Sequence, residues 1–260
     1  MTVRLALLGG IYNNYLALEA ALRQASELGA ESYYCLGDIG AFGPHPDRSF
    51  PLLHQYDVQC IQGNYDDSIG NELDDCQCGY TDARDNYFAQ KSYDYTLANT
   101  SDENKRFLKS LPHELILEIE SHRLLLCHGS PRRTNEFLWE STTPTHFLEL
   151  FFRERQVDFI AGTHTGIKWH QQTKLGRFVN IGVLGRPEND GQTNVWFTMV
   201  EVSRDEIRTS FHPVQYDHTR LSREMHQEGL PDEFIETIET GWWTTCLEIL
   251  PQKERKAGQF

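Results

Sequence analysis

Four short apolar segments of this chain each end in a polar side chain, and this pattern restricts the fold more than any other feature. The polar residues stand in Leu36-Gly37-Asp38, Ile61-Gln62-Gly63-Asn64, Leu126-Cys127-His128 and Gly162-Thr163-His164. If the segments are strands of α/β sheets, these side chains emerge at the carboxyl edge, where such sheets build their sites. A carboxylate, an amide oxygen and two imidazoles form a plausible ligand set for a divalent metal ion.

The spacing of apolar residues predicts that the chain begins strand, helix, strand, helix, strand. The strands are expected at 3–8, 32–36 and 58–62, and the helices at 17–28 and near 46–54. This alternation indicates βαβ units. We therefore expect parallel pairing in this part of the chain.

Residues 64–79 are expected to form an irregular acidic insert, and a hairpin is expected at 115–120 and 123–127. The remaining helices are predicted at 82–97, 102–109, 147–155, 219–228 and 231–240, and the remaining strands at 158–161, 166–171, 177–181, 195–202 and 207–211. Two mixed sheets flanked by helices fit this order. We expect an α/β fold, one domain over residues 1–250 and a flexible tail at 251–260.

The motifs and their order resemble those of the calcineurin-like metallophosphoesterases, and the resemblance covers nearly the whole chain. The matching segments are Gly37-Asp38, Gly63-Asn64-Tyr65-Asp66, His128-Gly129-Ser130-Pro131, the strand and turn from Asn180 to Pro187, Tyr216-Asp217 and Gly229-Leu230-Pro231. The best matches are to small bacterial and archaeal phosphodiesterase-like members. The resemblance implies a four-layer αββα sandwich and metal-dependent cleavage of phosphoesters.

Several positions depart from the family pattern. The family's Asp-x-His-Gly-Asn is Gly10-Ile11-Tyr12-Asn13-Asn14 here, its Gly-Asn-His-Asp histidine is Tyr65, and its closing Gly-His-x-His is Thr163-His164-Thr165-Gly166. Family members hold two metals that share one bridging Asp, and the resemblance implies that positions 10, 12 and 166 belong to the first metal. The protein shell of the second metal would be complete: Asp38, Asn64, His128 and His164.

We therefore expect a degenerate site with one divalent ion, Mn, Fe or Zn, and a metal-free protein is the alternative. A second register of the closing motif starts at Gly162 and would make His164 only a neighbour of the site. Ile167 and the distance from Asp158 favour the register in which His164 is a ligand.

Loss of one ion removes the bridged nucleophile and half of the clamp on the phosphoryl oxygens. The resemblance makes Tyr65 and Asp66 candidate catalytic residues, although a phenol with a pKa near ~10 is a poor acid–base group at neutral pH. Asn14, Arg132 and Arg133 are candidate substrate-binding residues, and ordinary surface arginines are the alternative for the last two. The predicted function is weak or altered hydrolysis of a small phosphorylated molecule. The alternatives are a pseudoenzyme that binds a phosphorylated ligand or protein, and a metal-dependent enzyme of another reaction class.

Composition restricts the partners and the compartment. A formal net charge of −14 disfavours nucleic acid and anionic membranes, because binding their phosphates requires clustered Lys and Arg. The apolar run at 3–8 is too short for a signal peptide or a membrane span. Cys35, Cys60 and Cys127 are expected as reduced core residues of a cytoplasmic protein. Cys76 and Cys78 form a possible redox or metal pair, but no second pair supports a zinc site. The oligomeric state is left open.

Overall fold

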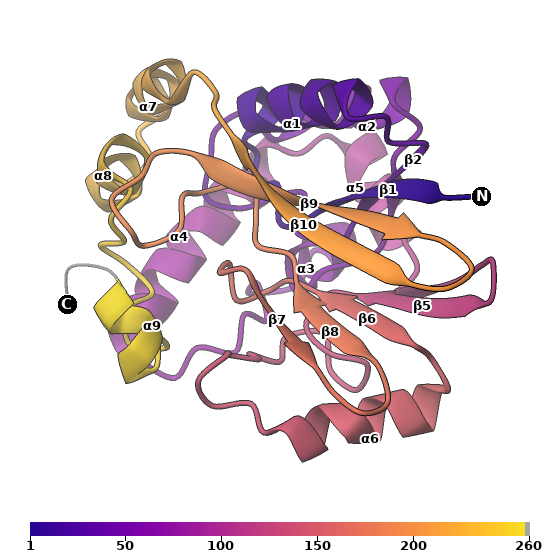
Figure 1. Cartoon of the computed structure of the whole chain (residues 1–260). Helices are drawn as coiled ribbons and strands as arrows, with labels where there is room; N and C mark the ends of the chain where they lie inside the picture. Colours follow the sequence, from indigo (N-terminus) through magenta and orange to yellow (C-terminus); the bar gives the residue numbers. More distant parts are fainter. Residues whose placement is uncertain (258–260) are drawn as a thin grey trace.

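Two β-sheets stack face to face, and helices cover both outer sides (Figure 1). The computed structural model describes residues 1–257. Sheet A has the strand order β10-β9-β1-β2-β3, and sheet B has the order β4-β5-β6-β8-β7. Each sheet contains both parallel and antiparallel pairs. The predicted α/β fold with two mixed sheets is confirmed.

Sheet A carries the N-terminal βαβ units. Its strands are β1 (Val3–Leu8), β2 (Ser32–Cys35), β3 (Gln59–Cys60), β9 (Val195–Val202) and β10 (Ile207–Val214). The elements that pack on its outer side and around its carboxyl edge are α1 (Tyr15–Glu27), η1 (Pro46–Arg48), α2 (Phe50–Gln55), α3 (Asn64–Asn71), α4 (Ala83–Asn99), α5 (Asp102–Lys109), α7 (His218–Gln227) and α8 (Asp232–Thr240). Strands β1, β2 and β3 run parallel, so their carboxyl ends lie at one edge.

Sheet B is built from the middle of the chain. Its strands are β4 (Glu114–Ile119), β5 (His122–Cys127), β6 (Phe159–Gly162), β7 (Trp169–Gln172) and β8 (Arg177–Asn180). Strands β4 and β5 form the predicted hairpin, and β5, β6 and β8 are parallel. Helix α6 (Thr145–Arg155) covers the outer face through Leu148, Phe151 and Phe152.

The alternation of side chains along the strands builds separate apolar layers. In β1, Leu5 and Leu7 belong to the core between the sheets, whereas Ala6 and Leu8 face the helices. Leu124 of β5 completes the core between the sheets from the other side. Full burial of each leucine contributes about 1.5–3 kcal/mol, so this core fixes how the two carboxyl edges meet.

Two segments differ from the prediction or extend it. Residues 64–79 are not irregular throughout, because α3 begins at Asn64 and the Asp66 carboxylate accepts a hydrogen bond from the Gly63 amide at 2.8 Å. After Leu250, where a flexible tail is predicted, the chain forms α9 (Gln252–Ala257), and Glu254 accepts a hydrogen bond from the Ser141 amide at 2.9 Å. Residues 258–260 lie outside the described part, so flexibility of the tail stays a prediction.

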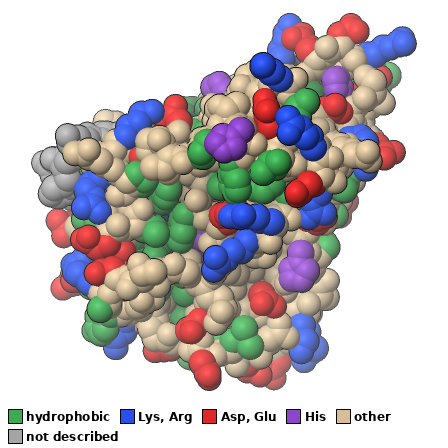
Figure 2. Space-filling view, turned by 90° about the horizontal axis from the view of Figure 1, so that it is seen from below, with side chains coloured by type: hydrophobic (Ala, Val, Ile, Leu, Met, Phe, Trp, Pro, Cys, Tyr) green, Lys and Arg blue, Asp and Glu red, His purple; other side chains and the backbone are tan. Residues whose placement is uncertain are grey.

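The cysteines and the surface add two observations. Cys35, Cys60 and Cys127 are free and buried as predicted, whereas Cys76 and Cys78 are joined in a disulfide. Acidic and basic side chains are interspersed on the face that carries α6 (Figure 2). Within residues 1–257, no helix has both the length and the hydropathy that crossing a bilayer requires.

Candidate metal centre

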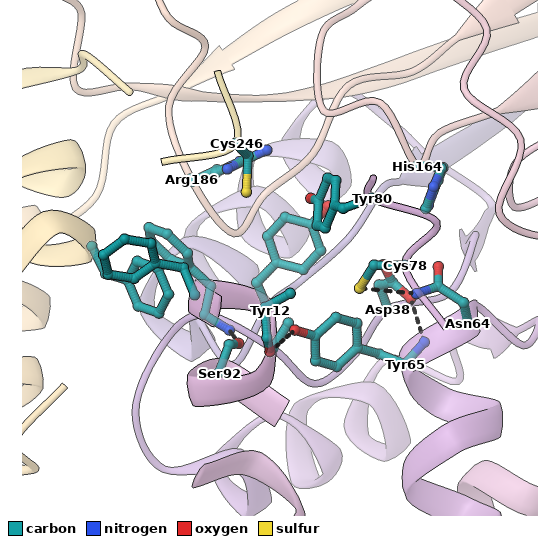
Figure 3. A pocket seen from close by; sticks show the side chains of 15 residues that line it. Tyr12, Asp38, Asn64, Tyr65, Cys78, Tyr80, Ser92, His164, Arg186 and Cys246 are labelled. Atoms are coloured by element: carbon teal, nitrogen blue, oxygen red, sulfur yellow. Dashed lines mark hydrogen bonds between the residues drawn. The ribbon is translucent and has the colours of Figure 1, made fainter. Parts of the chain in front are cut away.

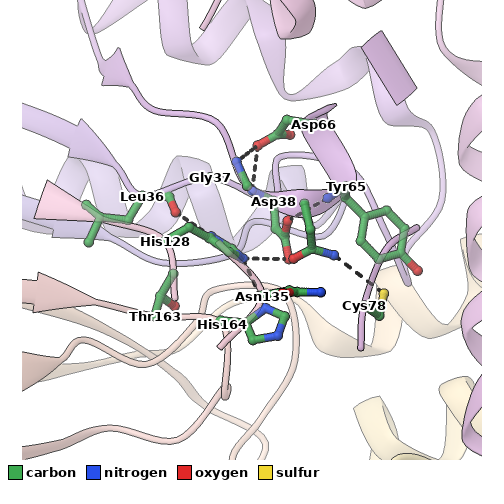
Figure 4. A network of polar contacts seen from close by, with 12 residues as sticks. Leu36, Gly37, Asp38, Tyr65, Asp66, Cys78, His128, Asn135, Thr163 and His164 are labelled. Atoms are coloured by element: carbon green, nitrogen blue, oxygen red, sulfur yellow. Dashed lines mark hydrogen bonds and ion pairs between the residues drawn. The ribbon is translucent and has the colours of Figure 1, made fainter. Parts of the chain in front are cut away.

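The predicted ligands come from both sheets and meet between them (Figure 4). Asp38 follows β2 and Asn64 begins α3 after β3, whereas His128 follows β5 and His164 follows β6. One ligand atom from each of Asp38, His128 and His164 lies within 4.8 Å of the others, and all three residues are buried. The structure thus brings His164 into the cluster, as the preferred register of the closing motif predicts.

Three close contacts define the geometry of this cluster. The His128 Nε2 atom lies 3.3 Å from Asp38 Oδ2 and 3.2 Å from His164 Nδ1. Ligand atoms held by one tetrahedral ion at about 2.1 Å lie about 3.4 Å from one another. The spacing of the cluster therefore matches that of groups that share a metal.

The hydrogen bonds of the imidazoles also fit a metal site. His128 Nδ1 lies 2.6 Å from the Leu36 carbonyl, which can only accept, so Nδ1 carries a proton and Nε2 faces the cluster. Burial lowers the pKa of this ring, but the charge of Asp38 and the hydrogen bonds raise it overall. Burial and the neighbouring His128 lower the pKa of His164 to about 3, so this ring is neutral. Its Nε2 atom is buried without a hydrogen-bond partner.

Asn64 adds a further acceptor beside the cluster. Its side-chain amide nitrogen donates to the Cys76 carbonyl at 2.8 Å, which identifies Oδ1 as the atom left over. That oxygen is buried and accepts no hydrogen bond. Buried acceptors without partners are rare because they lose hydration without compensation. A cation bound in the cluster would satisfy Asn64 Oδ1, so the residues present fit a divalent ion.

Asp66 holds the two ligand-bearing loops together. Its carboxylate accepts hydrogen bonds from the amides of Asp38 at 2.7 Å, Ile39 at 3.0 Å and Gly63 at 2.8 Å. Burial and the charge of Asp38 raise its pKa to about 6. Because both of its oxygens accept hydrogen bonds from backbone amides, this predicted catalytic residue holds the loops that carry Asp38 and Asn64 in position.

Tyr65, the other predicted catalytic residue, lines a cavity that opens beside the cluster and is described below. Its amide donates to Asp38 Oδ1 at 3.1 Å, and its hydroxyl donates to the Ala89 carbonyl at 3.2 Å. Burial raises the pKa of this phenol far above its ordinary value. The hydroxyl is therefore protonated at neutral pH and is already used in a contact with α4.

The structure does not bring the predicted substrate-binding residues into the cavity. Asn14 caps α1, because its Oδ1 accepts from the Ala17 amide and its Nδ2 donates to the Leu184 carbonyl. The Arg132 side chain is 58% exposed and paired with Glu136, and Arg133 donates to Asn135 Oδ1 at 2.6 Å. A role in substrate binding stays a prediction for these residues, and none of these contacts supports it.

A cavity opens beside the cluster, with about 50 Å³ of space available to the centre of a water-sized molecule (Figure 3). Asp38, Asn64 and His164 form part of its wall. Most of the remaining wall is aromatic and comes from Tyr12, Phe42, Tyr65, Tyr80, Phe88 and Phe234. Arg186 also lines it. This residue lies in the Asn180–Pro187 segment that resembles the family, but the sequence predicts no role for it in the site.

Tyr12 fills the space beside two glycines near the cluster. A Cβ atom added to Gly10 would lie 2.4 Å from Tyr12 Cε1, and one added to Gly185 would lie 2.2 Å from Tyr12 Cβ. A Cβ atom added to Gly166 would lie 3.6 Å from Arg186 Nη2. The phenol ring of Tyr12 thus fills the space beside Gly10, and the guanidinium group of Arg186 lies beside Gly166.

Comparison with known proteins agrees with this geometry. Residues 4–205 match the model of the calcineurin-like phosphoesterase superfamily domain. An uncharacterized protein of Methanocaldococcus jannaschii is 21% identical over 250 residues, which are 91% of this chain and 98% of that protein.

Two crystal structures share the fold. A hypothetical protein from Pyrococcus horikoshii OT3 superposes with a TM-score of 0.78 at 24% identity, over 93% of this chain and 100% of that chain. A metallophosphoesterase from Sphaerobacter thermophilus superposes with a TM-score of 0.73 at 22% identity, with the same coverage of 93% and 100%. At this level of identity, the two structures support the architecture alone.

Proposed function

The chain belongs to the calcineurin-like phosphoesterase superfamily, and from this premise we propose that it is a phosphoesterase that uses one divalent ion. Its substrate would be a small phosphorylated molecule, and its hydrolysis would be weak or altered. The observation that carries the proposal is the buried cluster of Asp38, His128 and His164, together with the unpartnered Oδ1 of Asn64.

The contacts of Asp38 support one ion rather than two. Asp38 Oδ1 accepts the Tyr65 amide, which leaves Oδ2 turned toward His128. The ring of Tyr12 packs against Gly10 and Gly185, and positions 10 and 12 are two of the three that the resemblance assigns to the ligands of the other metal. A site with a single carboxylate oxygen free and a filled neighbouring space is suited to one cation.

The chain's own residues would prepare this site for phosphoester chemistry. When bound, a divalent ion supplies Lewis-acid polarisation of a phosphoryl oxygen. The Leu36 carbonyl orients the His128 ring, and Asp66 orients the loops that carry Asp38 and Asn64. The aromatic wall beside the cluster excludes water from one side of the bound molecule and favours a substrate with an apolar portion.

A second candidate function is binding without turnover. The hydroxyl of Tyr65 donates to the Ala89 carbonyl, and burial raises its pKa, so it is poorly placed to protonate a leaving group. This observation favours a protein that binds a phosphorylated ligand through the same cavity and releases it unchanged.

Elemental analysis of the purified protein, beside a screen of phosphomonoesters and phosphodiesters, tests the proposal. We expect one divalent ion per chain in the wild-type protein, and neither ion nor hydrolysis in His128→Ala. His170→Ala is the matched control, because His170 is exposed on β7 and should leave both properties unchanged.

Two results would change the conclusion. Two ions per chain, together with hydrolysis as fast as that of two-metal enzymes, would contradict the single-ion site. One ion that depends on His128, with no hydrolysis of any substrate, would establish the binding function instead.

A further inference from the structure

Arg186 is a buried cation in the wall of the cavity. It is 7% exposed and follows β8 in the turn Gly185-Arg186-Pro187. Figure 3 shows Arg186 beside Cys246 on one side of the cavity, and Asp38 and Asn64 on another. The guanidinium group and the candidate metal cluster therefore border the same space.

Within residues 1–257 no carboxylate oxygen lies within 4 Å of Arg186, although the charge of this arginine acts at longer range on the buried Asp85 carboxylate. The Nε atom of Arg186 is buried without a hydrogen-bond partner in the described part of the chain. Nearby polar side chains are the phenols of Tyr12 and Tyr80, whose pKa is raised by burial, and the thiol of Cys246. A charge removed from water without an anionic partner is costly, so the arrangement needs a reason beyond packing.

Aromatic rings account for part of the surroundings of the guanidinium. Arg186 Cζ lies 3.6 Å from the ring centre of Trp243 and 5.9 Å from that of Phe42. Cation–π contact uses the flat face of the group, and the N–H donors along its edge remain. Gly166 borders this group, because a Cβ atom added there would lie 3.5 Å from the Trp243 ring and 3.6 Å from Arg186 Nη2.

We propose that Arg186 binds the phosphoryl group of the ligand, so that the cavity offers one positive charge from the protein and one from the metal cluster. This inference rests on the proposed function for the identity of the ligand. The planar fork of a guanidinium matches two oxygens of a phosphoryl group, and Trp243 holds the fork in one orientation. Binding of phosphate by Arg186 does not itself require the ion.

The competing explanation is that Arg186 only fastens the segment around Trp243. That indole already donates to the Pro187 carbonyl at 2.7 Å, and its amide donates to Asn189 Oδ1 at 2.9 Å. If fastening were the whole role, removing the charge would lower stability and leave affinity for anions unchanged.

Calorimetric titration with inorganic phosphate separates these explanations, with the full chain examined both metal-loaded and after chelation. We expect Arg186→Gln to weaken phosphate binding by at least about tenfold in both states, with metal content unchanged. Arg186→Lys keeps a charge but loses the fork, so it should weaken binding by a smaller factor. Arg153→Gln is the control, because Arg153 is 62% exposed on α6 and paired with Glu149.

Unchanged affinity for phosphate in Arg186→Gln, or no phosphate binding by the wild-type protein at millimolar concentration, would overturn the inference. Equal affinity for acetate and phosphate would overturn the assignment to a phosphoryl group. If Arg186→Gln does not fold, Arg186→Lys decides, and wild-type affinity in that variant would overturn the role of the fork. Arg186-dependent phosphate binding by a protein that takes up no metal would refute the proposed function and leave this inference standing.

Discussion

Replacing Asp66 distinguishes a catalytic carboxylate from one that positions the site. The Asp66 carboxylate accepts three backbone hydrogen bonds, from the amides of Asp38, Ile39 and Gly63. Alanine at this position would leave all three buried donors without partners. Asparagine can keep the acceptor for Asp38 and Gly63, but it would turn an amide nitrogen toward the N–H of Ile39.

The loss of stability can be bounded from these contacts. A hydrogen bond to a charged group contributes about 1.5–3 kcal/mol, and burial of the carboxylate, which raises its pKa, offsets part of that gain. We expect Asp66→Ala to lower the free energy of unfolding by about 3–5 kcal/mol, and Asp66→Asn by about 1–3 kcal/mol. Because the loops that carry Asp38 and Asn64 would loosen, metal affinity should fall by about 10–100-fold in Asp66→Asn.

Urea unfolding and metal titration of the purified variants measure both effects. Asp67→Asn is the matched control, because Asp67 is in the same helix and its carboxylate accepts a hydrogen bond from the exposed Asn71 side chain. Its free energy of unfolding should stay within about 0.5 kcal/mol of the wild-type value. If Asp66→Asn keeps wild-type stability and metal affinity but loses hydrolysis, Asp66 is catalytic and the positioning argument is wrong.

Three further predictions follow from other contacts. Burial raises the pKa of Glu224, but hydrogen bonds, first that from Tyr15, lower it overall. Glu224→Gln should therefore be about 1 kcal/mol less stable than wild type at neutral pH. In urea unfolding, this difference in the free energy of unfolding should disappear below about pH 4, where the carboxylate becomes protonated. Tyr65→Phe should cost about 1 kcal/mol in urea unfolding and leave any hydrolysis nearly unchanged, whereas a loss of about 100-fold would assign its hydroxyl to catalysis. Gly185→Ala should lower the free energy of unfolding by about 1–3 kcal/mol in thermal unfolding, because its Cβ would meet Tyr12 Cβ at 2.2 Å. In a protein that already carries Tyr12→Gly, adding Gly185→Ala should have no such cost if the clash is the cause.

The architecture and the metal cluster could be predicted because both depend on regular patterns. Short apolar runs separated by helical spacing define parallel strands, and parallel strands place Asp38 and His128 at carboxyl edges. The motif order then indicates that the two edges face each other. His164 follows from the same order, although its neighbours Thr163 and Thr165 left the register open.

Other features depend on contacts that no local pattern encodes. The sequence of helix α3, with Gly70 and several short polar residues, has low helix propensity and does not predict a helix, but the capping contacts of Asp66 outweigh this preference. The burial of Arg186 depends on Trp243, which is distant in the sequence. The arginines in the Pro131-Arg132-Arg133 run carry the more conspicuous sequence pattern, yet one of them is paired with Glu136 at the surface.

The four candidate ligands divide equally between the two sheets, and the apolar core between the sheets sets their spacing together with the hydrogen bond from His128 to the Leu36 carbonyl. Asp38 and Asn64 are fixed to sheet A and His128 and His164 to sheet B, and the core around Leu7 and Leu126 lies between the sheets. The distance between the two pairs of ligands therefore depends on the volume of the apolar side chains in this core. A substitution in this core can alter which ion is preferred without touching a ligand, so drift among leucines and valines is a route by which metal selectivity can evolve.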